Sequence, residues 1–245
     1  VDYFSYYQGS SKNHQDFLHR HQILLQKRKE NHKVLSKSQQ NYSTLFHSNK
    51  ILTATYIGTI FSSFISMTIN IIEDEKLNMI GDSSSALSKT WYKRNENNVL
   101  LKQLRNNTLN FFNNRPIVYN EETKRFEKAK SKNNIWTTFK DYKEKISGKG
   151  YAKGYIPSNM RASNAYKDRT AIAYLVNKYF NPFIKNFFVS KGIEVNEDGY
   201  ALSEMLQFLW RSGIREGKVI TVYIPSSRMR KLLKDWINEQ EYEDV

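Results

Sequence analysis

The sequence contains no cysteine. Disulfide bonds, thiol catalysis and cysteine-bound zinc are therefore excluded. Its longest apolar stretch, Ile51 to Ile72, is interrupted by Thr, Ser, Asn and Gly, which is typical of buried core rather than of a membrane-spanning helix. The first residues also lack the charged, apolar and cleavage regions of a secretory leader. These absences lead us to expect a cytoplasmic protein without a membrane partner.

Two kinds of binding motif are also missing. No Gly-x-x-x-x-Gly-Lys-Ser/Thr loop is present, so we expect that this chain cannot hold a nucleoside triphosphate by itself. His19 and His21 would diverge on a helix, and His14 lies too far from them for a ligand pair one helical turn apart. We therefore expect no metal site.

Positive charge is what the chain has in excess. It carries 38 Lys and Arg against 24 Asp and Glu, for a net charge of +14. The stretch from Lys124 to Arg169 alone has 13 basic and 4 acidic residues. Such a concentration favours an anionic partner, most simply DNA or RNA. The alternative is a solvated basic surface without a specific partner.

The order of expected elements indicates an α/β fold. The 245 residues are 39% hydrophobic, which is enough to bury a core. Strand and helix patterns alternate, which favours a largely parallel sheet covered by helices. We expect strands over 51–55, 116–119, 151–157 and 219–224, and helices over 15–40, 98–112, 199–213 and 226–238. We also expect a helix over 170–188 that is capped by Asp168 and kinked or split at Pro182. Over 135–146 we expect either one helix or a strand leading into one.

Three segments have residue types suited to ligand contacts. Thr53-Ala54-Thr55 ends an expected strand, where small hydroxyl residues can sense a nucleotide. Gln207, Arg211 and Arg215 are spaced by four and would share one helix face, which suits a triphosphate. The loop 158–169 is rich in donors that could hold a nucleic-acid backbone, namely Asn159, Arg161, Asn164, Lys167 and Arg169. For each segment the alternative is an ordinary strand end, helix surface or self-capping loop.

Taken in order, these segments resemble the carboxy-terminal half of a superfamily-2 helicase of the DEAD/DEAH-like kind, as carried by bacterial plasmids, phages and integrative elements. Val1-Asp2 would end the DExD/H box, and Thr53 to Thr55 match the Ser/Thr-Ala-Thr motif. Ser158 to Asn164 occupy the strand-loop position. The run from Gln207 to Arg215 is similar to the Gln-x-x-Gly-Arg-x-x-Arg motif, with Trp in place of Gly and the second Arg one residue late.

The resemblance implies RecA-like parallel sheets flanked by helices. Residues 1–75 would be the remainder of a first lobe, 76–98 a connection, and 99–245 most of a second lobe with helical additions. The parent protein would hydrolyse ATP with Mg²⁺ and move along DNA or RNA. Its phosphate-binding loop would lie upstream of Val1, so this fragment alone would be inactive.

The same resemblance assigns roles to single residues. Arg211, Arg215, Gln207 and Asp2 would contribute to ATP hydrolysis. Thr53, Ala54 and Thr55 would couple the nucleotide state to lobe closure, and the residues of the loop 158–169 would grip the backbone.

Two alternatives remain open from the sequence. One is a non-catalytic, basic nucleic-acid-binding module of a mobile-element replication or recombination protein. The other is a structural protein whose basic faces bind an acidic partner.

Overall fold

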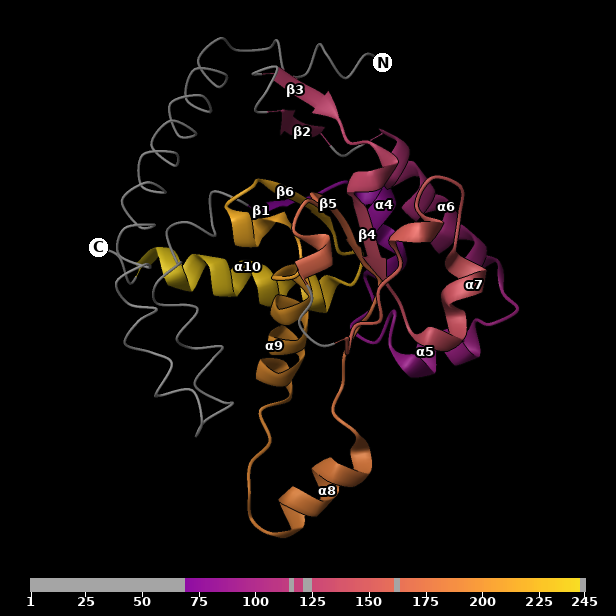
Figure 1. Ribbon diagram of the computed structural model, residues 1–245. Helices are drawn as coiled ribbons and strands as arrows, with labels where there is room; N and C mark the ends of the chain where they lie inside the picture. Colours follow the sequence, from indigo (N-terminus) through magenta and orange to yellow (C-terminus); the bar gives the residue numbers. More distant parts are fainter. Residues whose placement is uncertain (1–68, 115–116, 121–124, 161–163, 243–245) are drawn as a thin grey trace. The chain divides into compact units, whose positions relative to one another are not determined.

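A computed structural model describes residues 69–114, 117–120, 125–160 and 164–242 (Figure 1). These residues belong to one compact unit that begins at Thr68. The expectations for Asp2, for the helix over 15–40 and for Thr53, Ala54 and Thr55 lie outside the described residues, as does Arg161.

A four-stranded sheet forms the centre of this unit, in the order β1-β6-β5-β4. Neighbouring strands are parallel throughout, with Ile69 opposite Ile220, Ala171 opposite Thr221, and Asn134 opposite Ala171. The strands are β1 (Ile69–Ile71), β4 (Asn134–Thr137), β5 (Ala171–Tyr174) and β6 (Ile220–Tyr223).

Helices cover both faces of the sheet, so the inner strands β5 and β6 are buried at every position. Trp136, Ala173 and Tyr223 point into one core, and Ile172 and Val222 point into the other. The first core is completed by α4 (Glu75–Asn78), α5 (Lys89–Arg94), α6 (Val99–Asn114) and α7 (Lys143–Ile146). The second is completed by α9 (Glu197–Leu209) and α10 (Ser227–Tyr242). The predicted α/β fold, with a parallel sheet flanked by helices, is confirmed.

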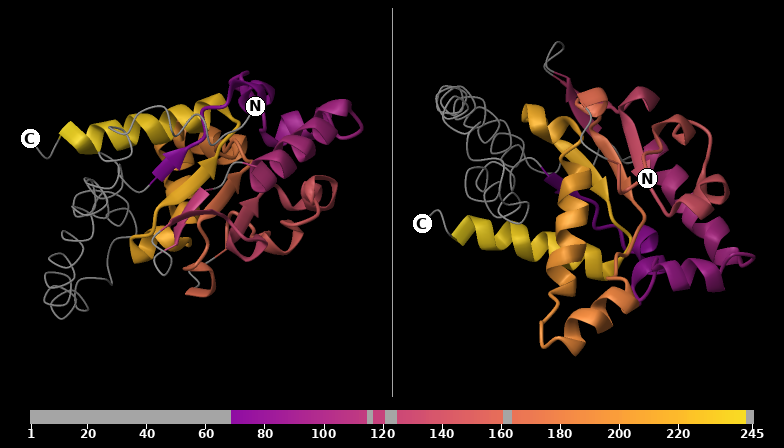
Figure 2. Two further views of the ribbon diagram at one scale, coloured as in Figure 1. Left: turned by 90° about the horizontal axis from the view of Figure 1, so that it is seen from above. Right: turned by 60° about the horizontal axis from the view of Figure 1, so that its bottom comes forward.

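Two further elements extend from this layered body at opposite ends (Figure 1). The antiparallel hairpin of β2 (Ile117–Asn120) and β3 (Arg125–Lys128) confirms the strand predicted near 116–119. At the other end lies α8 (Pro182–Ser190), which the views of Figure 2 also show apart from the sheet.

Helical periodicity identified α6 and α9 correctly. In α6 the buried residues Leu101, Leu104, Phe111 and Phe112 recur at helical spacing. In α9 the Asn196 side chain caps the helix by accepting a hydrogen bond from the backbone N–H of Gly199 at 2.7 Å. The strand predicted near 219–224 and the final helix are likewise present as β6 and α10.

The helix predicted over 170–188 is wrong in its first part, where residues 171–174 form β5. The predicted split at Pro182 is present, because α8 begins there with Pro182 in its first turn. A short apolar run buried on both faces has the composition of a buried helix segment, and periodicity alone cannot separate the two. Asp168 is not a helix cap. Its carboxylate instead pairs with Lys218 at 2.7 Å.

Little of the strand predicted over 151–157 is present in the structure. Residues 152–154 form a 3-10 turn, and only Tyr155 makes a parallel bridge, with Trp136.

The predicted division into a first lobe over 1–75, a connection over 76–98 and a second lobe over 99–245 remains a prediction, because residues 1–68 lie outside the described residues. β1 pairs with β6, so it belongs to the same sheet as the later strands. Leu77, Leu87 and Tyr92, from the supposed connection, are buried in the first core. The polar, Ser-rich composition of this stretch gave no indication of these three buried side chains, because they are widely spaced along the chain.

Close backbone packing at Gly81 gives a test of this arrangement. A Cβ atom added there would lie 1.9 Å from the carbonyl oxygen of Pro225, just after β6. We expect Gly81→Ala to lower the free energy of unfolding by about 1–3 kcal/mol, because backbone atoms must move apart. Chemical denaturation measures this change. Ser83→Ala, at an exposed position two residues on, should stay within about 0.5 kcal/mol of wild type, and an equally mild Gly81→Ala would contradict the packing.

Candidate nucleic-acid interface

The segments that enter the strands gather at one edge of the sheet, because all four strands run in the same direction. Residues 128–133 enter β4, residues 164–169 enter β5, and residues 213–218 enter β6. Tyr155 runs parallel to β4, so the turn before it, residues 148–154, lies at this edge as well. We call these four segments the amino-edge surface.

Hydrogen bonds between the segments join them into one surface. The backbone N–H of Gly213 donates to the carbonyl of Arg169 at 2.7 Å. The Asn133 side chain donates to the carbonyl of Asp168 at 3.3 Å, and the Asn134 side chain donates to the carbonyl of Gly150 at 3.1 Å. Four stretches that are far apart in sequence therefore hold fixed positions relative to one another.

The charge of this surface is strongly one-sided. Its four segments contain nine Lys and Arg side chains but only two acidic ones, Asp168 and Glu216. Seven of the nine are exposed: Lys128, Lys130, Lys132, Lys149, Lys153, Lys167 and Arg215. The hydrogen bond and the charge of Lys218 lower the pKa of the Asp168 carboxyl, so Asp168 is ionised and neutralises Lys218. The remaining charge produces a positive potential suited to a polyanion.

Three of the predicted backbone-binding residues, Asn164, Lys167 and Arg169, lie within this surface. Lys167 is exposed there. Arg169 is half-buried, and its guanidinium donates to the carbonyls of Lys132 and Asn134. It therefore joins the segment before β5 to the segment before β4. Asn159 is exposed in the preceding loop, and Asn164 begins the 3-10 turn that leads to β5.

Sequence reasoning missed most of the lysines of the amino-edge surface as individual residues. Lys130, Lys132, Lys149 and Lys153 stood out only as part of the basic stretch 124–169. Their convergence depends on strand direction, which charge density does not reveal.

The Arg211 side chain is buried and hydrogen-bonded within the protein. It is only 6% exposed, and its guanidinium donates to the carbonyl of Ser158 at 3.2 Å and to that of Met160. Burial, opposed by the nearby Glu204 carboxylate, lowers the pKa of the guanidinium. Arg211 therefore ties the end of α9 to the loop that enters β5.

Gln207 and Arg215 do not converge with Arg211 on one helix face. Gln207 is exposed on α9, where its amide lies 3.3 Å from the Ser203 hydroxyl. Arg215 is exposed in the 3-10 turn Gly213–Glu216. The helix ends at Leu209, so the spacing of four no longer describes a shared face beyond that point.

The opposite, carboxyl edge is where open α/β sheets usually bind their ligands. Here the chain's own groups fill that edge. The buried Asn177 side chain, which follows β5, donates to the carbonyls of Ser84 at 2.7 Å and Ala86 at 2.9 Å. Arg228 donates to the Asn177 side-chain oxygen at 2.8 Å and pairs with Asp198 at 2.5 Å.

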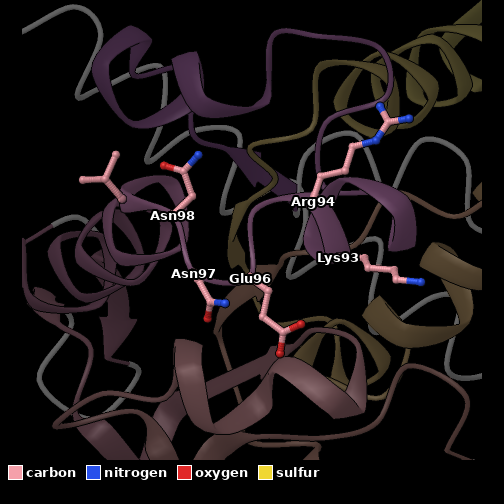
Figure 3. A pocket seen from close by; sticks show the side chains of 6 residues that line it. Lys93, Arg94, Glu96, Asn97 and Asn98 are labelled. Atoms are coloured by element: carbon pink, nitrogen blue, oxygen red, sulfur yellow. The ribbon is translucent and has the colours of Figure 1, made fainter.

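A shallow hollow near the turn between α5 and α6 does not form a convergent site. Figure 3 shows the side chains of Lys93 and Arg94 directed away from that of Glu96. Glu96 is itself paired with Lys145 at 2.8 Å. Within the described ranges, no group of three His, Asp or Glu side chains could hold a metal ion. None of the helices in the same ranges is long and apolar enough to cross a membrane.

Comparison with known proteins agrees with the layered fold. Residues 63–237 match the family of the YonV C-terminal Rossmann-like domain, and the chain belongs to this family. It is 49% identical over 172 residues to the SPbeta prophage-derived protein YonV of Bacillus subtilis (strain 168), a match covering 70% of this chain. The matched region spans only 38% of that relative's length. No solved structure matches the chain significantly.

Arg211 and Gln207 provide a matched pair of variants. We expect Arg211→Ala to lower the free energy of unfolding by about 1–3 kcal/mol, because two carbonyls lose their donor. Gln207→Ala, at an exposed position on the same helix, should change it by less than about 0.5 kcal/mol. Chemical denaturation of both variants measures the difference. If Arg211→Ala were as stable as the wild type, the two carbonyl contacts would contribute little to stability. The guanidinium of the wild type would then be available for a ligand.

Proposed function

We propose that this domain is a non-catalytic nucleic-acid-binding module of a mobile-element protein, and that the amino-edge surface is its interface. The observation that carries the proposal is the nine-to-two excess of basic over acidic side chains on four hydrogen-bonded segments. The prophage origin of the relative from Bacillus subtilis is consistent with a mobile-element setting.

The chemistry of the surface favours contacts to the phosphate backbone. Six of its seven exposed cations are lysines, which act as point charges and carry no fixed pattern for reading base edges. Tyr166, an aromatic of this surface, packs its ring partly against the second core. We therefore propose binding with little sequence preference and with strong dependence on salt.

An ATP-driven helicase or translocase is the second candidate, and its support is the α/β fold together with the motif order. The geometry favours it less. Arg211, its proposed γ-phosphate contact, already donates to two carbonyls, and Arg215 precedes β6 at the amino edge. The activity of the longer parent, including any use of ATP and Mg²⁺, remains a prediction from the resemblance.

Paired charge variants test the proposed interface. We expect Lys132→Gln combined with Lys167→Gln to weaken oligonucleotide binding roughly tenfold and to reduce the slope of log affinity against log salt by about 1.4 for a single strand. Fluorescence anisotropy with a labelled oligonucleotide, measured across a salt series, gives both quantities.

The matched control removes the same charge elsewhere. Lys89→Gln combined with Lys93→Gln changes two exposed lysines of α5, which lies outside the amino-edge surface. This variant should bind almost as wild type does. Equal weakening in both variants would mean that net charge, rather than the amino-edge surface, determines binding. Failure of the wild type to bind would exclude the proposed function.

A further inference from the structure

Helix α8 is mostly apolar, yet its side chains are exposed to solvent. None of its residues is buried. Phe183 is 86% exposed and Phe187 is 60% exposed, and Ile184, Val189 and Ile193 are exposed as well. Phe183, Ile184 and Phe187 share one side of the helix by their spacing, and Ile193 follows the end of the helix. Val189 is exposed on the opposite side of α8. We call Phe183, Ile184, Phe187 and Ile193 the α8 patch.

The base of α8 is firmly held. The Glu197 carboxylate accepts a hydrogen bond from the backbone N–H of Phe180 at 3.0 Å and pairs with Lys185, also at 3.0 Å. The Phe180 ring meets the Tyr200 ring edge-on, with centroids 4.8 Å apart. The Asn181 side chain caps the helix. Exposure of the α8 patch is therefore a property of a fixed helix rather than of a frayed segment.

The charge around α8 suits contact with an identical surface. Lys185 is the helix's single charged residue, and Glu197 neutralises it. Lys191 and Glu194, which have opposite signs, flank the end of the helix. Two copies meeting about a twofold axis would therefore neither repel each other there nor bury an unpaired charge. A nucleic-acid backbone, in contrast, requires unpaired cations.

The apolar area suits a weak, reversible dimer. With about 200 Å² for a whole phenylalanine, the exposed parts of Phe183 and Phe187 amount to about 300 Å². Ile184 and Ile193 bring the patch to roughly 470 Å², hence about 950 Å² over two copies, which is the size of a small, transient interface.

We propose that a second copy of this chain covers the α8 patch, so that the protein is a homodimer joined through α8. The contact lies at the carboxyl edge of the sheet, where α8 follows β5, and thus at the far end from the amino-edge surface. Both basic surfaces stay open in such a dimer. If they bind nucleic acid as proposed, one dimer engages a strand at two points and gains affinity by avidity.

Light scattering coupled to gel filtration tests the dimer without nucleic acid, so its outcome is independent of the proposed function. The 245-residue chain should run as a dimer that dissociates on dilution. Phe183→Glu combined with Phe187→Glu should be monomeric with an unchanged circular dichroism spectrum, because both side chains are exposed. Val99→Glu, which replaces a 69%-exposed valine on α6, should stay dimeric. A monomeric wild type, including one that binds lipid vesicles instead, or a dimer that persists in the double Glu variant, would overturn the proposal.

Cross-linking adds a second measurement, because the chain has no cysteine of its own. Ser190→Cys, in the last turn of α8, should form a reducible covalent dimer under mild oxidation. Ser83→Cys, in an exposed loop, should not. Equal cross-linking of the two variants would contradict a contact through α8.

Discussion

The common direction of the four strands is the constraint on which the remaining features depend. Helices cover both faces of the sheet, so polar segments reach solvent mainly at its two edges. Because β4, β5 and β6 are parallel, every segment that enters a strand is brought to the same edge. Lysines from residues 128–133 and 213–218 thereby share one surface, although residues 134–212 separate them in the sequence. An antiparallel strand among them would move its charges to the other edge.

The two edges of the sheet are built differently. At the amino edge, backbone and amide hydrogen bonds hold the segments together and leave the lysine side chains outside. At the carboxyl edge, Asn177 and Arg228 are used to bind other parts of the chain. That edge instead presents the apolar α8 patch. The division separates the surface that we propose for a polyanion from the patch that we propose for a second copy of the chain.

The sequence predicted those features that local chemistry determines. Apolar periodicity identified α6 and α9, and the β-branched run followed by Pro225 identified β6. Tertiary context decided the features that it missed. The β5 run is buried on both faces and has no strand alternation, so it was predicted to be a helix.

The site assignments show the same limit. Arg211 was assigned to ATP from its spacing and from the motif resemblance, yet the helix ends before it and the side chain turns toward the loop 158–160. The basic stretch 124–169 correctly indicated where positive charge is concentrated, but the positions of its lysines on one edge follow from the sheet topology. The roles predicted for Asp2, Thr53, Ala54 and Thr55 remain predictions.

Photo-cross-linking of a bound oligonucleotide, followed by mass spectrometry of the cross-linked peptides, tests the central claim most directly. The amino-edge surface predicts cross-links within residues 128–133, 148–154, 164–169 and 213–218, and their loss at high salt. Cross-links confined to the loop 82–88 or to α8, at the opposite edge of the sheet, would contradict it.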